Sequence, residues 1–413
     1  LPNNVNSEKA VVTTDGQVGY YNNAGAYVSM NQTIGLSQFN NPAGLEKAGL
    51  NVRIGQDFEP TCIETMKANG YKVLGGDIRE IEPQQMLDLA GLNVGEPFLV
   101  CGGPPCQPFS TAGKRLGIND PRGSLFMDYI RMIDYIKPRF FIMENVKGIM
   151  SAPLRHVPIA ERNADDPEQQ LGTVLDVILS EFDKLGYKTV YGVLDAVNYG
   201  VPQFRERFVL IGSRDHEDIF LPIPTHFQMH QKEEYRWKTV GEAIGDIENE
   251  KGECATLSKE RAHYLEMVPE GGNWKDLPED IKKIAMGGAY ESGGGKVGFY
   301  RRLSYSQPAP TVVTSPVQKA TMMCHPRMDR PLSVHEYARL QQFPEGWKFI
   351  GTTAAKYRQI GNAVPIGLAE AIGRAIIATA DKTALIKTKR FRGTDIHNRI
   401  KNALELGGNA VCQ

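Results

Sequence analysis

The stretch Pro97-Phe98-Leu99-Val100-Cys101-Gly102-Gly103-Pro104-Pro105-Cys106-Gln107 joins an apolar run to a turn built of glycine and proline. A short apolar run that ends in such breakers is typical of a buried strand. Further along, a second apolar run, Phe140-Phe141-Ile142-Met143, ends in Glu144-Asn145-Val146. Both runs therefore carry a reactive side chain, first a thiol and then a carboxyl, just past the end of an expected strand. A thiol nucleophile and an acid are what an enzyme needs to attack an electron-poor ring while protonating it.

Around these two runs, short apolar segments alternate with longer helical patterns, which predicts βαβ units on a doubly wound, mostly parallel sheet. The expected strands are residues 52–54, 98–100, 140–143, 190–194 and 208–211. The expected helices are residues 43–48, 60–69, 125–136, 172–185, 334–342 and 366–379. The first strand of the sheet is either 27–30 or 33–36. The sequence therefore predicts an α/β fold.

The length of 413 residues allows two domains, and the pattern changes after Gly212. Residues 216–300 are rich in charge and glycine, with interspersed aromatic side chains, which predicts a second, smaller domain spanning 216–330. We assign 1–215 with 330–385 to a discontinuous first domain, on which the helix 366–379 packs, and 386–413 to a basic tail. The segment 387–392 of that tail is as compatible with a solvated end as with nucleic-acid binding.

Composition indicates a soluble globular protein, with 41% hydrophobic and 23% charged residues and a net charge of −1. There is no apolar run of about 20 residues and no secretory signal at the N-terminus, so we expect a cytoplasmic protein without a membrane segment. The six cysteines form no CxxC pairs or zinc-type clusters, so we expect reduced thiols and no metal site. Cys101 fits a buried thiol, whereas Cys106 lies in a proline- and glycine-rich loop.

Two further motifs complete a recognisable set: Gln203-Phe204-Arg205-Glu206-Arg207 and Gly361-Asn362-Ala363-Val364-Pro365. Together with the cysteine turn and Glu144-Asn145-Val146, they resemble the DNA (cytosine-5) methyltransferase family of the bacterial restriction-modification type. The resemblance runs from about residue 45 to 375, and the motifs occur in the family's order. It implies a Rossmann-like fold that uses S-adenosylmethionine, with a smaller target-recognition domain.

The resemblance also assigns catalytic roles. Cys106 would attack C6 of a cytosine that has been flipped out of the duplex, and Glu144 would act as the acid at N3. Arg207 would contact O2, with Arg205 on the same side of the Gln-x-Arg-x-Arg repeat. Asn145 would orient the loop that holds Cys106. No side chain stands out as the base for the C5 proton, so we expect water.

For the cofactor, the resemblance places Asp57 at the ribose hydroxyls and Asp77-Ile78 at the adenine. The other expected cofactor contacts are Phe58, Pro104, Leu125, Asn362 and Val364. The family's glycine-rich first turn is missing from residues 30–44, although Asn41 as N-cap and Pro42 still predict the start of a helix. This variant turn would bind the same cofactor, accept a modified sulfonium, or have lost binding; we favour the first.

The resemblance makes double-stranded DNA the partner. The expected DNA contacts are Gln107, Ser110, Gln203, Arg301 and Thr311, and the loop 109–123 would close over the flipped base. We also expect 286–300 and 311–315 to face DNA, because they flank the domain junction.

We expect a protein that acts as a monomer on DNA in the cytoplasm, with a cognate endonuclease acting separately. Two alternatives remain: an RNA cytosine-5 methyltransferase, and a catalytically idle DNA-binding relative. The size of the 216–300 region favours duplex DNA. The presence of Cys106, Glu144 and Arg207 together favours an active enzyme.

Overall fold

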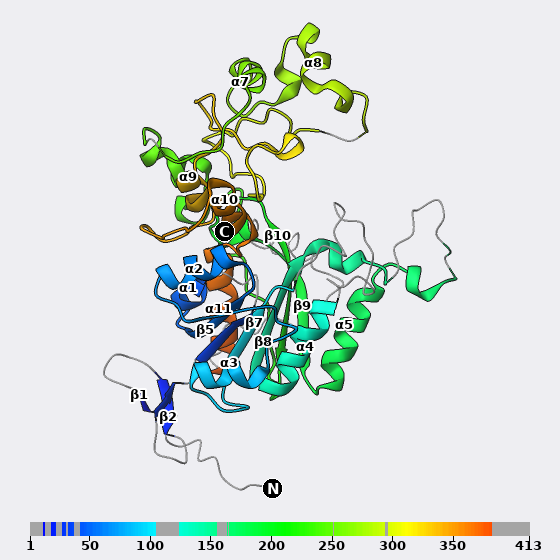
Figure 1. Cartoon of the computed structure of the whole chain (residues 1–413), viewed down its shortest axis with the longest axis vertical. Helices are drawn as coiled ribbons and strands as arrows, with labels where there is room; N and C mark the ends of the chain where they lie inside the picture. Colours follow the sequence, from blue (N-terminus) through cyan, green and yellow to red (C-terminus); the bar gives the residue numbers. More distant parts are fainter. Residues whose placement is uncertain are drawn as a thin grey trace.

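The structure is a computed structural model that describes residues 32–36, 42–104, 125–154, 163, 165–250, 252–293 and 296–381. It also describes the backbone of residues 11–12, 18–21, 27–29 and 124. Three predicted site residues, Cys106, Gln107 and Ser110, lie outside this part, as do Asn41, the loop 109–123 and the tail 386–413. In the described part a sheet domain lies below a second lobe, which we define as residues 240–363 (Figure 1).

The sheet has seven strands in the order β6-β5-β4-β7-β8-β10-β9 within the described residues. Their bounds are β4 (Gln32–Leu36), β5 (Asn51–Asp57), β6 (Val73–Gly75), β7 (Leu99–Gly102), β8 (Phe140–Val146), β9 (Lys188–Asp195) and β10 (Glu206–Ser213). The strand pairs are parallel except for those of β10 with β8 and β9. This confirms the predicted mostly parallel sheet.

The first strand of this sheet is β4, so of the two predicted registers 33–36 is correct and 27–30 is wrong. The backbone at Tyr27–Ser29 forms β3 of a separate antiparallel sheet with β1 (Val11–Val12) and β2 (Val18–Tyr21). That small sheet lies near the N-terminus, below the sheet domain (Figure 1).

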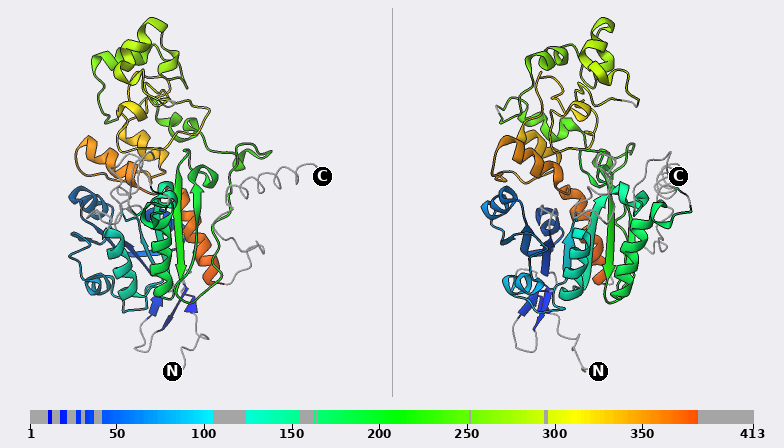
Figure 2. Two further views of the ribbon diagram at one scale, coloured as in Figure 1. Left: turned by 90° about the vertical axis from the view of Figure 1, so that its right-hand side faces the viewer. Right: turned by 45° about the vertical axis from the view of Figure 1, so that its right-hand side comes forward.

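Helices cover both faces of the large sheet, as Figure 2 shows. One core cluster contains α3 (Pro83–Ala90), α4 (Ser124–Ile136) and α5 (Thr173–Lys184), and the other contains α1 (Pro42–Lys47) and α11 (Ile366–Ala380). The residues of β8 alternate between the two clusters, because successive side chains of a strand point to opposite faces. A further helix of the sheet domain, α2 (Pro60–Ala68), packs beside β5 and β6. The fold is therefore doubly wound.

The chain reverses direction across the sheet between β4 and β7. From β4 it runs outward to β5 and β6, and then returns to form β7 on the other side of β4. Doubly wound proteins bind ligands at the carboxyl ends of the strands beside such a reversal. In Figure 1 this edge of the sheet faces the second lobe.

The second lobe is built from short helices: α6 (Val240–Ile244), α7 (Lys259–Glu266), α8 (Glu279–Met286), α9 (Val334–Leu340) and α10 (Thr353–Asn362). One of its cores joins α6, α9 and α10 with Leu303 and Val312. A smaller core joins Leu265, Leu277 and Tyr300. Within the predicted closing segment, Ala363 packs in the core of the second lobe and Val364 packs in a core of the sheet domain.

One described stretch, Thr353–Ala380, is long and apolar enough to cross a membrane, by length and composition alone. Of its most apolar part, 61% is buried inside the protein. It comprises α10 and α11, whose apolar residues pack in the two cores just described. We therefore interpret it as core helices.

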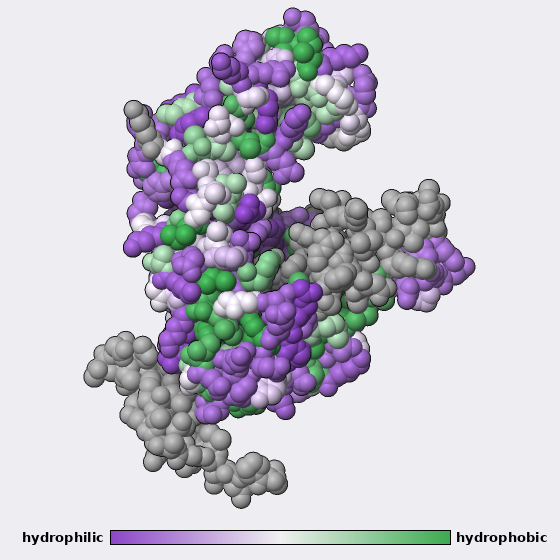
Figure 3. Space-filling model, viewed as in Figure 1, coloured by the Kyte–Doolittle hydropathy of each residue, from purple (hydrophilic) through white to green (hydrophobic). Residues whose placement is uncertain are grey.

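The surface is hollowed beneath the second lobe, on the side where β10 runs (Figures 1 and 3). The carboxyl ends of the parallel strands open toward this region.

Candidate active site

Glu144 and Arg207 form a buried pair across two neighbouring strands. The antiparallel register of β8 and β10 pairs Glu144 with Val209 and Arg207 with Val146, which puts both side chains diagonally on one face. Nε of Arg207 lies 2.7 Å from Oε1 of Glu144, and both side chains are largely buried. Burial raises the pKa of the Glu144 carboxyl, against the opposing attraction of the Arg207 and Arg205 guanidinium groups.

A carboxyl whose pKa is raised holds its proton more readily and can donate it to a ring nitrogen. The guanidinium beside it can donate to an oxygen on which negative charge develops. The pair therefore offers an acid and a cation side by side, as recognition of the N3 and O2 edge of a pyrimidine requires.

Asn145 ties the end of β8 to the end of β7. Its Nδ2 donates to the carbonyl oxygen of Pro104 at 3.1 Å, and its Oδ1 accepts from the Val146 amide at 2.8 Å. The side chain is almost fully buried. Since Pro104 stands two residues before Cys106, this bond holds the chain where the cysteine loop begins.

A pocket opens at the carboxyl ends of β4 to β7, where the chain reverses. It is lined by Leu36, Gln56, Phe58, Asp77, Ile78, Arg79, Gly103, Pro104, Leu125 and Tyr129. Five of the eight predicted cofactor residues are among them. The pocket wall at β7 needs glycine, because a Cβ on Gly102 would lie 2.6 Å from the Tyr129 ring. Sequence reasoning did not single out Leu36, Gln56, Arg79 or Tyr129.

The other three predicted cofactor residues, Asp57, Asn362 and Val364, are not among the lining residues. Asp57 lies between two lining residues, is buried, and accepts a hydrogen bond from the Glu59 amide at 2.8 Å. Asn362 is exposed at the end of α10, whereas Val364 is buried in the core beneath α11. Their contacts with a cofactor stay predictions.

Arg79 holds the carboxylate of Asp77 at the rim of the pocket. Its Nε lies 2.9 Å from Oδ1 and 3.0 Å from Oδ2 of Asp77. The hydrogen bond from Arg79 lowers the pKa of the Asp77 carboxyl below its ordinary value. The pocket therefore presents a charged acceptor to a ligand that carries N–H or O–H groups.

These walls fit the nucleoside part of S-adenosylmethionine. The Phe58 side chain is 59% exposed, so its ring is available to a planar base. Leu36, Ile78 and Leu125 supply apolar wall, and Asp77 supplies an acceptor. A mostly apolar cavity with a few placed polar groups is what small-molecule sites require.

Arg205 lies in a buried junction between the sheet and the second lobe. Its Nη1 donates to the carbonyl of Val312 at 2.7 Å, and its Nη2 donates to those of Gly361 and Ala363 at 2.8 and 3.2 Å. The side chain is 2% exposed. These contacts describe a residue that positions the closing motif, and a catalytic role for it stays a prediction.

The amide of Gln203 belongs to the same junction. Its Nε2 donates to the carbonyl of Leu340 and to Oε1 of Gln341, and its Oε1 accepts from the amide of Val312. The side chain is fully buried, so the predicted DNA contact would require these bonds to break. Gln341, which the sequence did not single out, also donates to the carbonyls of Ile360 and Ala363.

The two remaining predicted DNA contacts also bond within the protein. Arg301 Nε donates to the carbonyl of Met322 at 3.0 Å, and Thr311 Oγ1 donates to that of Phe204 at 2.8 Å. Thr311 thereby lies beside the Gln-x-Arg-x-Arg segment. The DNA-binding roles of both residues stay predictions.

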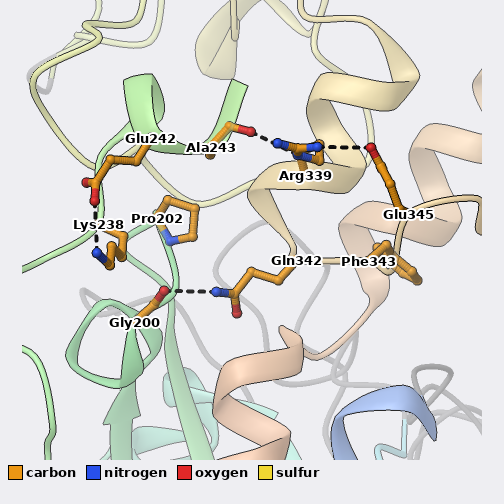
Figure 4. Close-up of a pocket in the computed structure, with 9 residues that line it drawn as sticks. All are labelled: Gly200, Pro202, Lys238, Glu242, Ala243, Arg339, Gln342, Phe343 and Glu345. Atoms are coloured by element: carbon orange, nitrogen blue, oxygen red, sulfur yellow. Dashed lines mark hydrogen bonds and ion pairs between the residues drawn. The ribbon is translucent and has the colours of Figure 1, made fainter. Parts of the chain in front are cut away.

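A larger cavity, of about 470 Å³, lies at the junction of the sheet domain and the second lobe (Figure 4). Its charged side chains pair with one another, Lys238 with Glu242 and Arg339 with Glu345. Gln342 donates across it to the carbonyl of Gly200. The Gln342 bond ties the end of α9 to the segment before β10, and Arg339 Nε donates to the carbonyl of Ala243 in α6 at 3.0 Å, which indicates a structural junction.

The charged groups of the candidate site have no metal-binding arrangement. Within the described ranges, no group of three or more His, Cys, Asp or Glu side chains could hold a metal ion.

Comparison with known proteins agrees with this geometry. The family model described as "C-5 cytosine-specific DNA methylase" matches residues 40–378. The chain is 39% identical to Type II methyltransferase M.Sau96I of Staphylococcus aureus, over 81% of this chain and 72% of that protein. It is 38% identical to Type II methyltransferase M.PspPI of a Psychrobacter strain, over 81% of this chain and 75% of that protein.

A solved structure shows the same fold. It is that of a putative DNA modification methyltransferase encoded within a prophage, from E. coli, and it aligns with a TM-score of 0.58 at 21% identity, over 85% of this chain and 99% of that one. Since the family model spans most of the chain and the fold agrees, the protein belongs to the C-5 cytosine-specific DNA methylase family and is a DNA cytosine-5 methyltransferase.

Proposed function

We propose that this protein methylates C5 of a cytosine flipped out of duplex DNA, through a transient bond between Cys106 and C6 of the ring. The observation that carries the proposal is the Glu144–Arg207 pair, with an N–O distance of 2.7 Å and a raised Glu144 pKa. An acid and a cation in this arrangement complement the N3 and O2 atoms of cytosine.

In the proposed reaction, the Cys106 thiolate adds to C6. The electron pair of the C5=C6 bond then forms a C4=C5 enamine. Glu144 gives a proton to N3, while Arg207 donates a hydrogen bond to O2. C5 thereby becomes a carbon nucleophile that takes the methyl group. Water removes the C5 proton, the thiolate leaves C6 as the C5=C6 double bond re-forms, and N3 returns its proton to Glu144.

S-adenosylmethionine is the proposed cofactor, and when bound it supplies an electrophilic methyl group on its sulfonium. The pocket at the ends of β4 to β7 would hold it, with Phe58 at the adenine and Asp77 as an acceptor. Asn145, through Pro104, would hold the chain between this pocket and the Cys106 loop. This arrangement favours the first of the three interpretations of the variant turn, in which the ordinary cofactor binds.

We further propose that the enzyme is the sequence-specific modification half of a restriction-modification system and acts as a monomer in the bacterial cytoplasm. The names of the relatives, Type II methyltransferases, support the restriction-modification role. A cognate endonuclease would act separately on the same duplex sequence. Bisulfite sequencing of DNA from cells that express the protein would report the modified base and its target.

A duplex containing 5-fluorocytosine at the target should trap the enzyme. Fluorine replaces the proton that must leave from C5, so the Cys106–C6 bond should persist after methyl transfer. We expect a DNA–protein band that survives denaturing electrophoresis when S-adenosylmethionine is present.

Cys106→Ser should give no such band, whereas Cys101→Ser, which alters a buried thiol on β7, should still give it. A trapped band in the Cys106→Ser protein, or none in the unaltered protein on methylatable DNA, would contradict the covalent mechanism.

A further inference from the structure

Gln56 is a buried amide in the wall of the cofactor pocket. It is the penultimate residue of β5, is 2% exposed, and precedes the predicted ribose ligand Asp57. Its Nε2 donates to the carbonyl oxygen of Gly76 at 2.6 Å. Because a carbonyl oxygen can only accept, this bond fixes which way the amide points.

The other end of the same amide is left without a partner. Oε1 of Gln56 is buried and has no hydrogen-bond partner among the residues that the structure describes. Buried polar atoms are nearly always paired, since an unpaired one keeps the penalty of losing its water. An orphaned acceptor in a pocket wall therefore indicates a ligand donor.

The position of Gln56 limits which part of a ligand it meets. The amide of Gln56 is bound to Gly76, which directly precedes Asp77 and Ile78. Phe58 lies two residues after Gln56 in the sequence. Asp77, Ile78 and Phe58 all line the same pocket. Gln56 therefore belongs to the part of the pocket that suits a nucleoside.

We propose that Gln56 Oε1 accepts a hydrogen bond from an N–H or O–H group of the nucleoside half of the cofactor. This inference rests on the proposed use of S-adenosylmethionine. It adds a cofactor-binding residue that the sequence motifs do not assign. The Gly76 bond holds the amide in place before the cofactor arrives, so little side-chain freedom is lost on binding.

The test compares Gln56→Met with Gln359→Met. Gln359 is also buried, donates Nε2 to a backbone carbonyl, that of Ile350, and leaves its Oε1 without a described partner. It lines a different cavity, with Cys62 and Trp347. The two substitutions remove the same set of bonds, but only one alters the cofactor pocket.

Titration calorimetry with S-adenosylhomocysteine should show about tenfold weaker binding to Gln56→Met and unchanged binding to Gln359→Met. The melting temperatures of the two ligand-free variants should shift alike. The loss should be equally large for 5′-methylthioadenosine, which keeps the nucleoside and lacks the amino-acid half.

Unchanged affinity of a folded Gln56→Met protein would overturn the inference, and a loss confined to S-adenosylhomocysteine would overturn the nucleoside assignment. If the unaltered protein bound neither probe, the proposed cofactor itself would be wrong, and the inference would fall with it.

Discussion

Glu144→Gln should lower kcat for DNA methylation by about 10²- to 10⁴-fold, the usual contribution of a general acid. The amide has the same shape as the carboxyl and still accepts the hydrogen bond from Arg207 Nε. It cannot deliver a proton to the ring, however. We therefore expect the loss to appear in kcat, with little change in the affinity for the cofactor.

The pH profile of kcat should report the same group. Because the pKa of Glu144 is raised, its protonated form persists at higher pH than that of an ordinary carboxyl, and activity should fall as pH rises through that pKa. Glu144→Gln should lose this limb, since an amide does not titrate.

Glu336→Gln is the matched control for Glu144→Gln. Glu336 is another buried carboxylate paired with a guanidinium, that of Arg330, at 2.7 Å. It lies on α9 of the second lobe, away from the pocket, so its replacement should lower stability and leave the limb of the profile in place. Equal kcat for Glu144→Gln and the unaltered protein would refute the role of Glu144 as acid.

The sheet of this protein could be predicted from sequence because its strands carry their own signal. Residues 140–143 form an uninterrupted apolar run, and in β8 these side chains pack alternately on the two faces. The three residues that follow in β8, Glu144-Asn145-Val146, were visible as a motif. By contrast, β6 has only three residues, Val73–Gly75, too few to show a period. The short helices α6, α7 and α8, of five, eight and eight residues, were not predicted either, and they pack in the cores of the second lobe.

The choice between two first strands needed information that lies elsewhere in the chain. Residues 32–36 form β4 because they pair with both β5 and β7. The segment 27–29 has a similar local composition, but its backbone pairs with β2 instead. A partner's register cannot be read from either segment alone.

The residues of the candidate site also fall into two groups, those that the sequence marks and those that only the fold reveals. Glu144, Asp77 and Phe58 were found because they occupy motif positions at strand ends. Gln56 and Gln341 carried no such signal, since a glutamine is marked only by what surrounds it in the fold. The surroundings of Arg205 were equally hidden, because its guanidinium meets carbonyls that are 107 to 158 positions away in sequence.

Arg205→Met should lower the free energy of unfolding by about 3–5 kcal/mol, the range for loss of one member of a buried charged network. The substitution keeps most of the side-chain volume. It leaves the carbonyls of Val312, Gly361 and Ala363 without their donor in a buried junction. The backbone around the junction cannot shift to give these carbonyls new partners, because it is closely packed. A Cβ on Gly361 would lie 2.5 Å from the carbonyl of Val313.

Chemical denaturation of Arg205→Met beside Arg339→Met would measure the effect. Arg339 is only partly buried and pairs with Asp246 and Glu345 at the rim of the junction cavity, so its loss should lower stability by about 1 kcal/mol or less. Arg205→Lys, which keeps a charge but cannot reach all three carbonyls in one plane, should fall between the two.

Because Asn362 lies between two of those carbonyls, cofactor affinity should also fall in Arg205→Met and stay unchanged in Arg339→Met. Equal stability of the two methionine variants would mean that the guanidinium of Arg205 does not hold the closing motif against the sheet, and its predicted place among the catalytic residues would then be the better explanation for an arginine at this position.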